Sequence, residues 1–163
     1  MSAAASTTLS ARKPMALAPI LWGGLTAGTL DLTAAFVTWG FKGVSPIRIA
    51  QSVASGLLGR AAYEGRLGTA ALGTALHFFI AFSATVVFYA ASRRLAFLTR
   101  HPVRWGFLYG ITVYMVMYWI VIPLSAIPKS QHPPSLSGTG IAILTHMFCV
   151  GLPISLSVWR YSR

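Results

Sequence analysis

The chain has 163 residues, of which 55% are apolar and only 9% are charged, and its mean hydropathy is +0.67. Soluble domains carry roughly 25% charged residues, so this composition excludes an ordinary water-soluble fold and predicts an integral membrane protein. The net charge of +11 comes from thirteen Lys and Arg residues against two acids, Asp31 and Glu64. The basic residues lie between apolar runs and lack the interleaved aromatics of a nucleic-acid surface. We therefore expect anionic headgroups of membrane lipids, and not nucleic acid, as their partners.

Residues 1–16 are rich in Ala, Ser and Thr and contain no acid. This composition predicts a disordered N-terminal tail, followed by a single transmembrane domain over residues 17–163. A mitochondrial presequence has the same composition, so that alternative stays open. The single cysteine, Cys149, excludes an internal disulfide.

Four apolar runs follow the tail, at about residues 17–39, 68–92, 105–124 and 138–159. At 1.5 Å per residue the first run reaches about 34 Å, which is enough to cross a hydrocarbon core of about 30 Å. A backbone in lipid must satisfy its own hydrogen bonds, and runs of this length are unlike the short alternating strands of a barrel. The sequence therefore predicts an all-α, polytopic membrane protein with four transmembrane helices.

An additional amphipathic helix is predicted between the first and second runs, at about residues 46–61. Ser45 and Pro46 form a typical helix start, with a hydroxyl cap followed by a proline at the first helical position. Apolar residues then recur at helical spacing, and a second side carries Arg48 with three polar residues, Gln51, Ser52 and Ser55. We expect this helix to lie on the membrane or to fold back against the bundle. A short helix packed on the loops, as in soluble proteins, is the alternative.

The distribution of basic residues predicts the orientation. With four spans both termini share one side, which would hold eight Lys and Arg residues against five on the other side. The first set is Arg12, Lys13, Arg93, Arg94, Arg100, Arg104, Arg160 and Arg163; the second is Lys42, Arg48, Arg60, Arg66 and Lys129. The excess predicts cytoplasmic termini for a protein of the bacterial inner membrane.

Two pairs of glycines have the GxxxG spacing that lets helix backbones approach closely in lipid. Gly24 and Gly28 lie in the first span, and Gly106 and Gly110 lie in the third. We assign all four to helix packing, and they also offer contacts for a homo-oligomer. Each pair is followed along the chain by a histidine within the next span, which suggests two helical hairpins in a parallel repeat.

Asp31 lies three residues after Gly28 and therefore shares its helix face. An ionisable residue within a span normally faces protein or water. His77 and His146 lie about as far from the outer ends of their spans as Asp31 does from its own. We therefore predict that these three residues form one intramembrane polar cluster, with at least one imidazole within reach of the carboxylate.

Three interpretations of the cluster stay open. Asp31 and the histidines could satisfy one another and fix the helix packing. They could relay protons or ions, since histidine titrates near neutral pH. His77 and His146 could also bind a metal or a bis-histidine haem, although two histidines and one acid make a thin ligand set. A nearby group of larger side chains, Tyr114, Met115, Met117 and Tyr118, is interpreted as packing, and Pro123 and Pro153 as bends in their helices.

Four stretches resemble the YagU-like family of small bacterial inner-membrane proteins. They are GLTAGTLDLTAAFVTWG from Gly24, LHFFIAF around His77, WGFLYG from Trp105 and THMF around His146. The resemblance covers about half of the chain and implies a helical inner-membrane protein. It transfers no established activity.

The leading functional prediction is a non-enzymatic membrane component without a cofactor. It would be a helper subunit or a small permease acting as an oligomer, with a link to proton movement. The sequence contains no nucleotide-binding glycine loop and no HExxH or GxSxG motif, and no metal site is assigned in this interpretation. The alternative is a redox protein that binds haem or a metal through His77 and His146.

Overall fold

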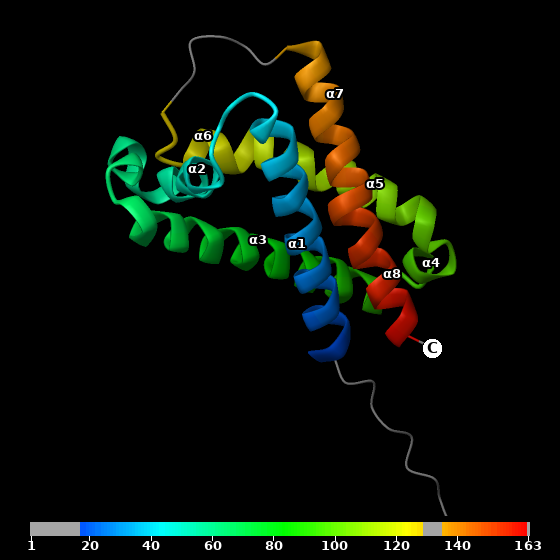
Figure 1. The fold of residues 1–163 in the computed structure, drawn as a ribbon. Coiled ribbons are helices and arrows are strands. Elements are labelled where there is room, and N and C mark those ends of the chain that lie inside the picture. The colour runs from blue at the N-terminus through cyan, green and yellow to red at the C-terminus, as the bar shows by residue number, and fades with distance from the viewer. Residues whose placement is uncertain (1–16, 129–134, 163) are drawn as a thin grey trace, which may run out of the picture.

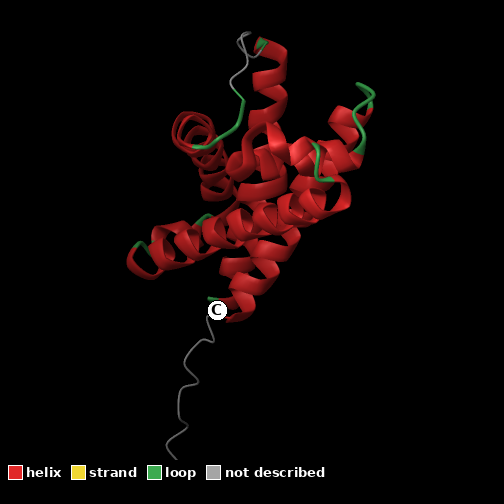
Figure 2. Ribbon diagram, turned by 90° about the vertical axis from the view of Figure 1, so that its left-hand side faces the viewer, coloured by secondary structure: helices red, strands yellow, loops and turns green. Residues whose placement is uncertain are grey.

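The computed structural model describes residues 17–128 and 135–162, so the predicted tail at residues 1–16 lies outside the described residues. Within these ranges the chain consists of helices joined by short loops and contains no strand (Figure 2). Four helical segments are long and apolar enough to cross a membrane: Leu17–Gly40, Arg66–Arg94, Pro102–Leu124 and Leu136–Tyr161. The predicted fold class, an all-α protein with four candidate transmembrane helices, is confirmed.

The first two spans are the continuous helices α1 (Leu17–Gly40) and α3 (Arg66–Arg94), with α2 (Pro46–Leu58) and the 3₁₀ segment η1 (Gly59–Tyr63) between them. A short helix, α4 (Phe97–Arg100), leads into the third span. That span consists of α5 (Pro102–Val116), η2 (Met117–Val121) and α6 (Ile122–Leu124). The fourth span consists of α7 (Leu136–Thr145), η3 (His146–Gly151) and α8 (Leu152–Tyr161). Each of the last two spans is therefore interrupted near its middle or end.

The interruptions η2 and η3 are π-helical turns, and each ends two residues before a proline, Pro123 or Pro153. Proline has no N–H and its ring crowds the carbonyl four residues earlier, so an α-helical ladder cannot continue through it. The backbone N–H of Ile122, before Pro123, donates to the carbonyl of Met117, and that of Leu152, before Pro153, donates to the carbonyl of Met147. Both prolines thus widen the preceding turn, and such π turns are frequent at functional sites.

The spans pack as two crossing pairs. α1 crosses α3 and also packs along α8, while α5 packs against η3 and α8 (Figure 1). Between them lies a small apolar core in which Phe88, Ile154 and Val158 are almost completely buried. This core joins the second span to the fourth and holds the two pairs together.

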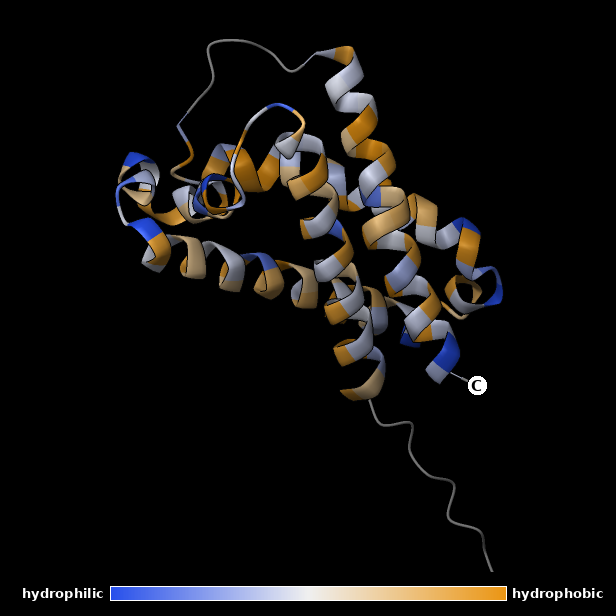
Figure 3. Ribbon diagram, in the orientation of Figure 1, coloured by the Kyte–Doolittle hydropathy of each residue, from blue (hydrophilic) through white to orange (hydrophobic). Residues whose placement is uncertain are grey.

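Most of the surface of the spans faces away from the rest of the chain. In the most apolar stretch of each span, between 6% and 28% of the residues are buried inside the protein. Large apolar side chains point outward, among them Phe79, Val87 and Trp119, which are 68%, 60% and 65% exposed. Hydrophilic residues gather instead at the helix ends (Figure 3). This distribution matches the requirement that lipid-facing surfaces be apolar.

The helix α2 folds back against the bundle. The Ser45 hydroxyl accepts a hydrogen bond from the Arg48 N–H, as expected for a helix cap. A Cβ added at Gly73 of α3 would overlap the Ala50 carbonyl, so the two helices touch through their backbones. On its other side, the Gly56 carbonyl accepts a hydrogen bond of 2.9 Å from the Ala126 N–H. α2 is therefore held between α3 and the end of the third span.

The burial of α2 follows the predicted sides only in part. Ala50 and Ala54 of the apolar side are buried, and Arg48 and Ser52 of the polar side are exposed, but other positions differ. Gln51 and Ser55 of the polar side are only 4% and 0% exposed, whereas Ile47 and Leu57 of the apolar side are 46% and 63% exposed. The Gln51 amide donates to the Arg66 carbonyl over 3.0 Å. The physical reason is the solvent: helices in lipid associate through small residues and interhelical hydrogen bonds, while apolar side chains can face outward.

Candidate functional site: an intramembrane cavity

The first glycine pair lies where α1 crosses α3. A Cβ at Gly24 would overlap the Phe82 ring, and a Cβ at Gly28 would lie 2.7 Å from the Phe78 ring. The imidazole of His77 reaches the same crossing, with its Nε2 atom 2.9 Å from the Gly28 carbonyl oxygen. The aromatic side chains of α3 therefore occupy the space that side chains on α1 would otherwise fill.

The second glycine pair lies where α5 crosses the fourth span. A Cβ at Gly106 would lie 3.0 Å from the Leu152 Cα atom, and one at Gly110 would lie 2.5 Å from the Met147 Cα atom. From the opposite helix, a Cβ at Gly151 would overlap the Gly106 carbonyl. All four glycines singled out in the sequence thus contact other helices of the same chain. A homo-oligomer would have to use a different surface.

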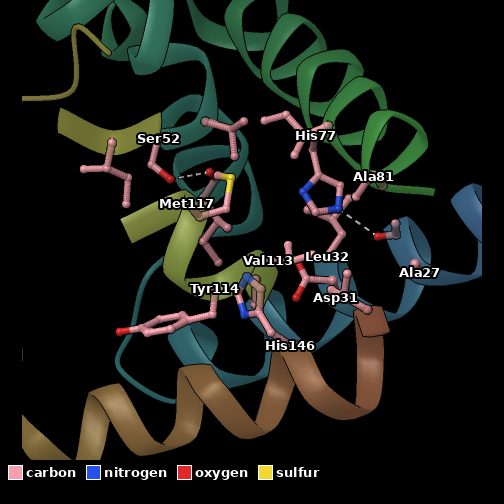
Figure 4. A pocket seen from close by; sticks show the side chains of 18 of the residues that line it. Ala27, Asp31, Leu32, Ser52, His77, Ala81, Val113, Tyr114, Met117 and His146 are labelled. Carbon is pink, nitrogen blue, oxygen red and sulfur yellow. Dashed lines mark hydrogen bonds between the residues drawn. The ribbon is translucent and has the colours of Figure 1, made fainter. Parts of the chain in front are cut away.

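A cavity of about 380 Å³ lies between the two crossings (Figure 4). α1, α3, the third span and the fourth span all contribute to its wall, and α2 closes one side with three residues. Its lining consists mainly of apolar side chains, with a few polar ones. The polar lining residues are Asp31, Ser52, His77, Tyr114, Tyr118 and His146.

The three residues of the predicted cluster all line this one cavity. Asp31 comes from α1, His77 from α3 and His146 from the first position of η3. Asp31 is half-buried and projects into the space between the two imidazole rings (Figure 4). It lies nine residues before the end of α1 at Gly40, which corresponds to a depth of about 13 Å along the helix.

Neither imidazole is hydrogen-bonded to Asp31. His77 Nε2 bonds to the Gly28 carbonyl, and His146 Nδ1 bonds to the Ala142 carbonyl over 2.9 Å. A carbonyl oxygen only accepts, so these nitrogens carry the protons, and the other nitrogen of each neutral ring is an acceptor. Within the described ranges Asp31 makes no hydrogen bond or ion pair. The carboxylate therefore shares a cavity with the two rings without being satisfied by them.

Three of the residues interpreted from the sequence as packing also line the cavity, namely Tyr114, Met117 and Tyr118. The Tyr114 ring meets the His146 ring edge-on at 5.6 Å between centroids and stacks on the Tyr118 ring at 5.9 Å. α2 contributes Ile49, Ser52 and Val53 to the lining. In the sequence, only Pro123 indicated that the wall near Tyr118 is unusual, because a proline disturbs the helical turn before it, and that turn carries Met117 and Tyr118.

The lining suits a positive charge or a proton better than a metal ion. In the described part of the chain, no group of three or more His, Cys, Asp or Glu side chains is arranged to hold a metal ion. The cavity offers one carboxylate, two imidazole acceptors and two phenols within an apolar wall. No family model, curated protein or solved structure matches the chain. The geometry of the cavity is therefore the basis for assigning a function.

Proposed function

We propose that this integral membrane protein is a small, non-enzymatic permease of the bacterial inner membrane whose cavity takes part in proton-linked transport. The observation that supports it is the position of Asp31, a half-buried carboxylate that faces a cavity and has no partner among the described residues. An ionisable group within a span costs at least about 2.5 kcal/mol on insertion scales. A purely structural carboxylate would recover that cost through hydrogen bonds, and none is present here among the described residues.

The neighbouring rings suit proton exchange. Histidine is the side chain whose charge changes most readily near neutral pH. In both His77 and His146 one ring nitrogen donates to a backbone carbonyl, so the other nitrogen of the neutral ring can accept a proton. A proton on Asp31 can therefore move to or from an imidazole through bound water in the cavity. The carboxylate and the rings would then share a proton without a fixed hydrogen bond between them.

The test is a pH step applied to vesicles that contain the purified protein and a pH-sensitive dye. We expect the wild type to equilibrate internal pH faster than empty vesicles, and Asp31→Asn to lose this difference while still inserting. The matched control is Glu64→Gln, which makes the same carboxylate-to-amide change at an exposed residue outside the cavity. Equal traces for the wild type, Asp31→Asn and empty vesicles would remove the proton link.

A helper subunit of a larger transporter is the second form of the same proposal. Four helices enclose little space, and the third span is the least covered, with 6% of its most apolar stretch buried. In that case isolated protein would show no flux, and co-purification from a native membrane would recover a larger partner. Membership of the YagU-like family remains a prediction from the four sequence stretches.

A bis-histidine haem protein is the alternative from another class. The observation that favours it is that each imidazole donates one N–H to a backbone carbonyl, as ligand histidines commonly do. A visible absorption spectrum of the purified protein decides the matter, because bound haem absorbs strongly. A spectrum without haem bands would leave the permease proposal in place.

We also propose cytoplasmic termini, on the excess of basic residues at the end of the molecule that carries Arg93, Arg94, Arg104 and Arg160. A reporter that works only in the cytoplasm should be active when fused after residue 163. Activity of a periplasmic reporter at the same position would reverse the orientation.

A further inference from the structure

We propose that the cavity binds a small organic monocation, such as a protonated amine or a quaternary ammonium ion with an apolar body, and that Asp31 is its counter-ion. This inference rests on the proposed function, since it names the ligand class of the same cavity. It follows from the charge, the size and the lining of the cavity.

The charge of the cavity excludes an anionic ligand. Among the described residues that line it, Asp31 is the single acid, and none is Lys or Arg. The ammonium of Lys42 lies over the ring of Trp39, which does line the cavity, at 4.5 Å from the ring centroid, but Lys42 itself is not a lining residue. An anion placed here would meet a carboxylate without any compensating cation, and a carboxylate repels like charge strongly where water is scarce. A cation would supply the partner that Asp31 lacks.

The lining indicates an organic cation and not a bare metal ion. A metal ion needs several oxygen, nitrogen or sulfur ligands converging at about 2 Å, and no such group of three acidic, histidine or cysteine side chains occurs among the described residues. A protonated amine needs only one counter-ion and a few acceptors. The free acceptor nitrogens of His77 and His146 could accept hydrogen bonds from its N–H groups.

The remaining wall suits an apolar body. The cavity volume of about 380 Å³ is near the lower end of small-molecule pockets, which hold roughly 300–1,000 Å³. Aliphatic residues of α1, α3 and α2 cover most of it, and the rings of Tyr114 and Tyr118 border it on the side of the third span. Aromatic faces attract quaternary ammonium groups. One phenyl ring attached to a charged nitrogen is therefore a fitting probe.

The experiment compares three probes built on one phenyl ring: benzyltrimethylammonium, benzyl alcohol and benzenesulfonate. Binding to the intact protein in an uncharged detergent is measured by isothermal titration calorimetry. We expect the cation to bind at least tenfold more tightly than the neutral and anionic probes. Asp31→Asn should weaken cation binding at least tenfold, and Glu64→Gln should leave it unchanged. Equal binding of the anion and the cation by the wild type would overturn the inference whether or not any variant folds.

A second variant moves the carboxylate without removing it. Val113 lies three residues after Gly110, as Asp31 lies three residues after Gly28, and it lines the same cavity. Asp31→Val should lose cation binding, and adding Val113→Asp should restore part of it. Size-exclusion chromatography and circular dichroism show whether each variant is folded. A folded double variant that binds the cation no better than Asp31→Val would overturn the proposed charge selection.

Failure of this inference can be distinguished from failure of the proposed function. Asp31-dependent proton flux without cation binding would overturn the ligand class and leave the proton link. Cation binding that depends on Asp31, without proton flux, would support the ligand class and remove the proton link. Both results come from the same purified preparations.

Discussion

Two helical hairpins make up the described part of the molecule: α1 with α3, and the third span with the fourth. In both, the two helices cross at a glycine pair, but the contacts at the crossing differ. In each, a GxxxG pair meets the next span, and its second glycine lies beside a histidine, Gly28 beside His77 and Gly110 beside His146. In the first hairpin the glycines receive aromatic side chains. In the second they receive backbone, so the two helices approach much more closely.

The difference separates adjustable packing from fixed packing. Phenylalanine rings such as Phe78 can turn when a neighbour changes, whereas a helix backbone cannot yield without displacing the whole span. The residue three positions after the second glycine also differs: it is Asp31 in the first hairpin and Val113 in the second. The first hairpin thus supplies the charge of the cavity, and the second supplies a rigid wall with its two π turns.

The largest expected effect is at Gly151, where the second hairpin is tightest. A Cβ there would overlap the Gly106 carbonyl and would lie 2.7 Å from the Gly110 Cα atom. Because both neighbours are backbone, we expect Gly151→Ala to lower the free energy of unfolding by about 3 kcal/mol, at the upper end of overpacking costs. Unfolding in mixed micelles with dodecyl sulfate measures this.

The matched control for this prediction is Gly140→Ala in the same span. A Cβ at Gly140 would meet no atom within 4 Å, and alanine favours a helix over glycine by roughly 0.5–1 kcal/mol. The control variant should therefore be as stable as the wild type or slightly more stable. If both variants had the same stability, the close backbone contact in the second hairpin would be refuted.

The sequence predicted the number of spans and their approximate positions because hydropathy and length determine them directly. Their contacts were harder to predict. The GxxxG spacing pointed to Gly106 and Gly110 but not to Gly151, which has no glycine partner four residues away and faces them from the other helix. For α2, the amphipathic pattern grouped Ala50 and Ala54, which are buried, but it did not predict that Gln51 and Ser55 also pack inward.

The cavity could be predicted only in part. The helix face and depth of Asp31, and the similar depth of His77 and His146, indicated one cluster, and the three residues do line one cavity. The partners of the rings could not be inferred from spacing. A histidine within a helix can donate to a carbonyl of its own or a neighbouring helix, and that choice depends on side-chain rotamers. Tyr118 lies within the π turn η2, where the residues that share a helix face no longer follow α-helical spacing, so its place in the wall could not be inferred from the sequence.

An intermediate effect is expected when the second glycines of the two pairs are compared directly. Gly110→Ala would push against the Met147 Cα atom and the His146 carbonyl, whereas Gly28→Ala would push against the Phe78 ring. We expect losses of about 2 kcal/mol and about 1 kcal/mol respectively, because only the ring can move aside. The measurement is unfolding in the same mixed micelles. A greater loss for Gly28→Ala would reverse the assignment of fixed and adjustable packing.

The smallest effect concerns the histidines beside those glycines. His77 ties α3 to α1 through the Gly28 carbonyl, whereas His146 bonds to Ala142 of its own span, whose carbonyl also accepts the His146 backbone N–H. Interhelical hydrogen bonds in membrane proteins contribute about 0.6 kcal/mol on average. His77→Leu should therefore cost about 0.6 kcal/mol, and His146→Leu less, since it removes no hydrogen bond between helices and a leucine can still pack against Tyr114. His77→Gln should recover part of the loss, because an amide N–H can donate to the same carbonyl.

His101→Leu, at an exposed position before α5, controls for the change in side-chain polarity. Equal losses for His77→Leu and His146→Leu would show that the first hairpin does not depend on this hydrogen bond, and that its aromatic contacts alone determine how α1 and α3 cross.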